Sequence, residues 1–191
     1  MGAHHRILKA ILEKQTPLPM AFGIIAGDKD EVLELLKRHE DAFQEHLSRL
    51  EGRVEMGLRV TWDVPNIFEY MVASHPELRD LRDSLFKSRQ EPSQEEMIEM
   101  GRLFEHILTE KRSEYSSLVE EILSPSCDEI RHRPERSEKE VMHLVCLVRR
   151  EDQGLFEDKI FEAANRFDND YAFDFNGPWA PHNFVDLQVE L

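Results

Sequence analysis

The stretch RVEMGLRVTWD, at residues 53–63, alternates between apolar and polar side chains along its length. One face carries Val54, Met56, Leu58, Val60 and Trp62, and the other carries Arg53, Glu55, Arg59, Thr61 and Asp63. Because successive side chains of a strand point to opposite faces, this alternation predicts a half-buried strand. The elements that follow it along the chain decide which kind of sheet it joins.

Helical and alternating segments follow this strand in a regular order. Beyond Pro65, a charged stretch interrupted by Pro76 indicates partial helix. Ser93 and Glu96 then form a capping box that opens a helix of about thirty residues, and Pro125 ends it. After this helix the pattern predicts a short strand at 127–132, the connection PERSEKE, a strand at 141–149, a helix over 156–167 and a last strand at 171–176.

The resulting βαββαβ order is that of the ferredoxin-like fold, in which helices pack on one face of an antiparallel sheet. We therefore expect an α+β protein with a ferredoxin-like domain over residues 53–191. Its long helix extends beyond the usual helix length.

Residues 1–52 fit this order poorly and predict a partial N-terminal α+β domain of helix, strand and helix. The apolar run MAFGIIA at 20–26 is typical of a strand covered on both faces. Asp28 and Glu31 form a capping box for a helix that runs to Gly52. The helix before the strand shows its apolar stripe at Ile7, Leu8, Ile11 and Leu12.

Composition excludes several classes of protein. Lys plus Arg number 24 and Asp plus Glu number 39, so the net charge is 24 − 39 = −15, which repels nucleic acid and anionic membrane surfaces. No apolar run is long enough to span a membrane, and no signal peptide is evident. Cys127 and Cys146 lack a CxxC spacing and indicate neither a disulfide framework nor a zinc site. We expect a cytoplasmic protein.

Motifs for catalysis or cofactor binding are missing from the sequence. It has no nucleophile elbow, no Walker-type glycine loop and no dinucleotide fingerprint. His39 and His46 lie on one face of a helix without a carboxylate at metalloprotease spacing, and 168–170 lacks the glycine and the final Glu of a calcium loop. We predict no enzyme activity, no cofactor and no metal.

The segment FDFNGPWAPHNFV, at residues 173–185, begins as a strand and then changes to Gly-Pro-Trp-Ala-Pro. Gly177 permits a turn that other residues resist, and Pro178 and Pro181 fix φ and remove N–H donors. The strand therefore cannot simply continue, and a stiff loop of this kind holds Trp179 in one place. The ring either plugs the core of its own domain or anchors a partner protein.

The GPWAPHNFV part of this segment, at 177–185, resembles the GPWPPY-F-V signature of the gas vesicle accessory proteins GvpF and GvpL. Further segments resemble that family in the same order: HHRILKAIL at 4–12, PLPMAFGII at 17–25, GRVEMGLRV at 52–60 and MIEMGRLFEHIL at 97–108. Ala21, Ala180 and His182 depart from the family pattern. Family members carry additional N-terminal sequence, so the resemblance implies that this chain is N-terminally truncated relative to the family.

The resemblance implies a non-enzymatic accessory protein of gas vesicle assembly. It implies binding of the small hydrophobic shell protein (GvpA type), and of other accessory proteins, in the cytoplasm and at the gas vesicle. The residues that it singles out for protein binding are Phe22, Gly23, Gly177, Pro178, Trp179, Pro181 and Phe184. The −15 charge adds a hypothesis: a strongly negative field would keep a complex with an aggregation-prone subunit soluble.

An alternative of another class is a ferredoxin-like small-ligand sensor or enzyme. Its ligand would occupy the cleft between the segment at 1–52 and the domain at 53–191. A metal or metabolite bound to the purified protein would favour this alternative.

Overall fold

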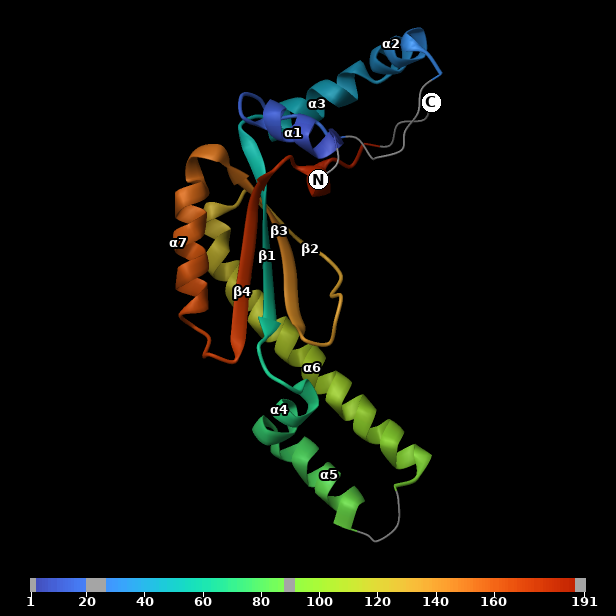
Figure 1. The fold of residues 1–191 in the computed structure, drawn as a ribbon, viewed down its shortest axis with the longest axis vertical. Helices are drawn as coiled ribbons and strands as arrows, with labels where there is room; N and C mark the ends of the chain where they lie inside the picture. Colours follow the sequence, from blue (N-terminus) through green and yellow to red (C-terminus); the bar gives the residue numbers. More distant parts are fainter. Residues whose placement is uncertain (1–2, 20–26, 88–91, 188–191) are drawn as a thin grey trace.

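A four-stranded antiparallel sheet forms the centre of the structure, a computed structural model that describes residues 3–19, 27–87 and 92–187. Its strands are β1 (Arg53–Trp62), β2 (Glu129–His132), β3 (Glu140–Arg149) and β4 (Tyr171–Trp179). They lie in the order β2-β3-β1-β4, so that the two central strands are β3 and β1 (Figure 1). This order confirms the predicted ferredoxin-like fold.

Two helices, α6 (Gln94–Leu123) and α7 (Gln153–Ala164), pack on one face of the sheet (Figure 1). The capping box predicted at Ser93 and Glu96 is present, and α6 has 30 residues. The apolar face of β1 meets buried side chains of both helices in a single core. From the helices this core takes Met100, Phe104, Ile107, Leu108, Val119, Leu123, Phe156, Ile160 and Ala163.

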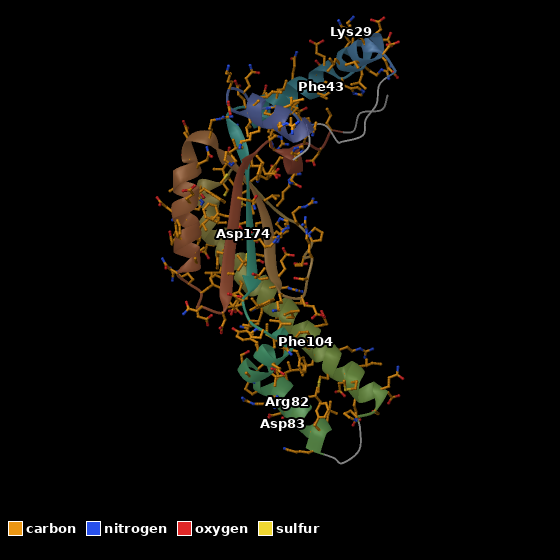
Figure 2. The ribbon with its side chains drawn as sticks, viewed as in Figure 1. Lys29, Phe43, Arg82, Asp83, Phe104 and Asp174 are labelled. Carbon is orange, nitrogen blue, oxygen red and sulfur yellow. The ribbon has the colours of Figure 1, made fainter. Side chains whose placement is uncertain are left out.

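The stretch between β1 and α6 is more helical than predicted. It forms α4 (Ile67–Ser74) and α5 (Pro76–Lys87), which accompany the half of α6 that projects beyond the sheet (Figure 1). Pro76 opens α5, because the first turn of a helix tolerates a residue without an N–H. Phe68 of α4 contacts Phe104 of α6, with ring centroids 5.4 Å apart, and Figure 2 shows Phe104 where the two helices meet.

The N-terminal helices differ from the prediction in one respect. The first is α1 (Ala3–Leu12), as expected, but the single helix predicted from Asp28 to Gly52 is divided into α2 (Lys29–Arg38) and α3 (Glu40–Leu50). The division falls at His39, whose backbone leaves the helical region with φ −113° and ψ 19°. The strand predicted at 20–26 lies outside the described residues.

The N-terminal segment is joined to the sheet by apolar contacts and hydrogen bonds. Leu12 belongs to the same core cluster as β1, and Leu50 packs on the opposite face of the sheet against Val145 and Leu147. The Thr16 hydroxyl donates to the carbonyl of Arg53 at 3.2 Å. The division into domains at residue 52 stays a prediction, because these contacts cross it without showing how the chain divides.

The polar face of β1 is more buried than its alternation predicted. Glu55 is only 6% exposed and Gly57 is buried, whereas Arg59 and Thr61 remain partly exposed. The face is therefore covered at one end of the strand and open at the other. The covering comes from Asn176 of β4, which lies over Gly57, and from the segment that follows β4, whose Asn183 bonds to Glu55.

Candidate functional site

The GPW segment continues β4 instead of ending it. Asn176 pairs with Gly57 of β1, and Trp179 pairs with Glu55, so two residues of β4 lie opposite the single residue Met56. This is a β-bulge, which adds a residue to one strand and bends it. The strand thus does not simply continue, as predicted, but it does not end at Gly177 either, because pairing resumes at Trp179 once the bulge has been passed.

Gly177 is required at this bulge for two reasons. Its φ of +134° lies in a region that other L residues rarely adopt. A Cβ atom added there would lie 2.7 Å from Sδ of Met56 and 2.9 Å from the carbonyl oxygen of Glu55. Backbone conformation and the available space thus both require glycine at position 177. Pro178, which is joined to it by a cis peptide bond, is exposed.

Trp179 is half-buried at the end of β4. Its indole N–H donates to Oδ1 of Asn176 at 2.6 Å, across the bulge. The ring also lines a cavity of about 210 Å³ together with Leu8 and Leu12 of α1 and with Pro178. The position allows both roles predicted for this side chain, since Trp179 is partly buried and partly exposed to solvent.

Phe184 is the side chain that plugs the sheet. It lies in the short helix η3 (His182–Phe184), is 0% exposed, and packs with Leu50, Val145 and Leu147. Pro181, which precedes η3, is buried as well. Of the other residues that the sequence indicated for protein binding, Phe22 and Gly23 lie outside the described residues.

A buried carboxylate holds η3 against β1. Oε2 of Glu55 accepts from the backbone N–H of Asn183 at 2.8 Å, and Oε1 accepts from its side-chain amide at 2.7 Å. Burial raises the pKa of Glu55, and the two hydrogen bonds from Asn183 partly offset this effect. The sequence could not reveal this contact, because its two residues are 128 positions apart.

Two arginines, Arg131 of β2 and Arg49 of α3, hold the same segment. The guanidinium of Arg131 donates to the carbonyl oxygen of Asn183 at 2.7 Å and to both carboxylate oxygens of Asp186 at 2.9 and 2.8 Å. It also lies over the ring of Phe184, 5.1 Å from its centroid. The hydrogen bonds with Asp186 raise the pKa of Arg131. Arg49 of α3 donates to the carbonyl oxygen of Phe184, so the N-terminal segment takes part as well.

A second cavity, of about 490 Å³, lies where the N-terminal segment meets the start of β1. Its lining includes Lys14, Thr16, Glu51 and Arg150. These two cavities are where the alternative small-ligand function would act, and that alternative stays a prediction. Within the described residues, no cluster of His, Cys, Asp or Glu could hold a metal ion, and no helix is long and apolar enough to cross a membrane.

Comparison with known proteins gives one family. The family model described as gas vesicle synthesis protein GvpL/GvpF matches residues 1–186. Gas vesicle protein F of Nostoc sp. is 24% identical to this chain, covering 97% of it and 76% of the relative. Gas vesicle protein F of a Streptomyces sp. is 26% identical, covering 96% of this chain and 76% of the relative.

Solved structures agree with the fold. The crystal structure of GvpF from Anabaena sp. matches with a TM-score of 0.85 at 24% identity, over 97% of this chain and 77% of that one. The crystal structure of GvpF from Microcystis aeruginosa matches with a TM-score of 0.79 at 20% identity, over 96% of this chain and 76% of that one. At these identities the likeness shows the fold alone.

Proposed function

The chain belongs to the gas vesicle synthesis protein GvpL/GvpF family, and we propose that it is a non-enzymatic accessory protein of gas vesicle assembly. In this proposal it binds the small hydrophobic shell protein of GvpA type, alone or with other accessory proteins, and aids nucleation or assembly of the shell. It would act in the cytoplasm and associate with the growing vesicle. The observation that carries the proposal is the family match over residues 1–186.

Exposed apolar side chains on the N-terminal helices support a protein-binding role. In α2, Leu35 is buried, whereas Val32, Leu33 and Leu36 are 40%, 44% and 45% exposed. Ile7 of α1 is also exposed. Exposed apolar side chains that gather into one patch, as on α2, are a feature of protein interaction sites. We place the first contact with the apolar shell subunit on these helices.

The signature segment supports the same proposal in a different way. Gly177, Pro181 and Phe184 form and cover the end of the sheet, so their part in binding is to hold the surface in shape. Trp179 and Pro178 have atoms at that surface, and a half-buried Trp is a side chain typical of the centre of a protein interface. We therefore assign direct contact to Trp179 and Pro178, and support of that contact to the other three.

The proposal is tested by mixing the purified chain with the shell protein and measuring how much shell protein stays in the supernatant after centrifugation. We expect the chain to keep it in solution. A gene deletion in the host, followed by a flotation assay, tests the assembly role. Sedimentation of the shell protein regardless of the chain, with flotation unaffected by the deletion, would contradict the proposal.

A variant pair tests the surface on the N-terminal helices. Leu36→Glu places one negative charge in the exposed apolar set, and Gln44→Glu places one at an exposed polar position of α3. We expect the first variant to lose most of its ability to keep the shell protein in solution, and the second to retain it. Equal behaviour of the two variants would remove α2 from the contact surface.

A further inference from the structure

β4 is an edge strand whose outer side is open. It pairs with β1 on one side, and within the described ranges no other strand pairs with it. The backbone N–H of Asp63 donates to the carbonyl oxygen of Asp170 at 2.7 Å. This bond shows which pairs of residues between β1 and β4 are hydrogen-bonded and which are not. Because hydrogen-bonded pairs alternate along such a ladder, Ala172 and Asp174 also bond to β1. The N–H and C=O groups of Tyr171, Phe173 and Phe175 therefore point outward.

An apolar ring stands beside this open edge. Phe161 of α7 is 60% exposed, and its centroid lies 6.5 Å from that of Phe175 in an edge-to-face arrangement. Figure 1 shows α7 along the same side of the sheet as β4. A strand added to β4 would alternate its side chains between the two faces of the sheet, and those on the helix side would cover Phe161.

Charge decides which kind of strand fits. A second copy of this chain would bring another net charge of −15 to the edge, which disfavours self-pairing. On the face away from the helices, Asp174 of β4 is exposed (Figure 2), and its neighbour across the ladder, Arg59, forms an ion pair with Glu140 at 2.7 Å. An incoming strand therefore gains by placing a Lys or Arg beside Asp174.

We propose that the outer edge of β4, from Tyr171 to Phe175, is a strand-addition site for an extended segment of the shell protein. That segment is apolar on the side that covers Phe161 and basic on the side that meets Asp174. This inference rests on the proposed function, because the shell protein is the partner in both.

The proposal is tested with the full chain and the shell protein by comparing Phe175→Pro with Phe175→Ala. Both variants lose the same ring, but only proline also removes the outward N–H. Since that N–H does not bond to β1, the change leaves the ladder within the sheet intact. We expect Phe175→Pro to bind the shell protein about tenfold more weakly than Phe175→Ala. In the wild-type complex, hydrogen exchange at the amides of Phe173 and Phe175 should slow by about tenfold or more.

A second pair of variants keeps the test valid should Phe175→Pro fail to fold. Phe161→Glu removes the apolar ring beside the edge, whereas Leu155→Glu changes another exposed side chain of α7 that points away from Phe161 by helical spacing. We expect binding to fall only for Phe161→Glu.

The outcomes separate this inference from the proposed function. No binding by the wild-type chain overturns both. Binding by the wild-type chain with unprotected edge amides, and with equal affinities within each pair of variants, overturns the strand-addition site and leaves the proposed function standing.

Discussion

Gly177 shows how a single residue determines the geometry of the site. Its positive φ lets β4 pass the bulge and pair again at Trp179, which brings η3 over the sheet. The sequence indicated that a special backbone conformation was needed here. It did not indicate that the strand would continue, because a bulge and a strand end use the same residues, Gly and Pro.

Gly177→Ala should destabilise the protein by about 2–4 kcal/mol, from backbone strain together with the contacts to Met56 and Glu55. Gly101→Ala is the matched control, because nothing lies within 4 Å of a Cβ at that position in α6. There alanine should stabilise the helix by about 0.5–1 kcal/mol. Urea unfolding followed by circular dichroism measures both changes. A Gly177→Ala protein as stable as the wild type would show that the bulge can relax.

Trp179 and Phe184 are the two aromatic rings of the signature, and they should respond differently to truncation. Phe184→Ala empties a fully buried site and should cost about 3–5 kcal/mol. Trp179→Ala removes a half-buried ring and should cost less, while reducing binding of the shell protein more than the loss of stability explains. Unfolding and binding are both measured for each variant. If Trp179→Ala binds normally, the ring has no part in binding the shell protein.

Local pattern predicted the elements whose signals are local. The alternation of β1, the capping box of α6 and the apolar run of β3 each gave an element that the structure contains. The break at His39 was missed because the apolar spacing continues through it from α2 into α3.

Contacts between elements that are far apart along the chain could not be predicted from the sequence. Glu55 was predicted to face solvent because it lies on the polar face of β1, and only η3, at the other end of the chain, explains its burial. Phe22 and Gly23 stay predictions, since the segment that contains them lies outside the described residues.

Arg131 of β2 holds the segment after β4 in place, and Arg131→Lys tests this link between two elements. A lysine cannot reproduce the paired hydrogen bonds to Asp186 together with the bond to Asn183. We expect the free energy of unfolding to fall by about 1–2 kcal/mol. Relative to the wild type, hydrogen exchange should become faster in η3 and change less in α6. Arg82→Lys, at an exposed pair with the adjacent Asp83 (Figure 2), should change little. Equal effects of the two changes would show that the segment is held mainly by Phe184.

The molecule as a whole is elongated, with its sheet between two helical ends. α2 and α3 project at one end, and α4, α5 and the first half of α6 project at the other (Figure 1). Exposed apolar side chains occur at both ends, including Leu33 and Leu36 on α2, Phe86 on α5 and Ile98 on α6. The proposed function would use both features: the apolar side chains would contact the shell subunit, and the large negative charge would keep the complex soluble.

The charge hypothesis predicts that solubility of the complex follows net charge while binding does not. Four exposed glutamates of α6 can be changed to glutamine, which moves the net charge from −15 to −15 + 4 = −11. These are Glu95, Glu99, Glu105 and Glu121. The opposite variant changes four exposed basic residues to glutamine and moves the charge to −15 − 4 = −19. These are Arg79, Lys87, Arg102 and Arg166.

Light scattering of each variant mixed with the shell protein measures aggregation, and affinity is measured separately at low concentration. We expect more aggregation for the −11 variant and less for the −19 variant, with similar affinities, because self-repulsion acts between complexes rather than within the interface. Added salt should narrow the difference, since it screens exposed charges separated by more than about 10 Å. If the two variants aggregate equally at low salt, the acidic surface has no protective part, and solubility of the complex comes from burial of the apolar surface alone.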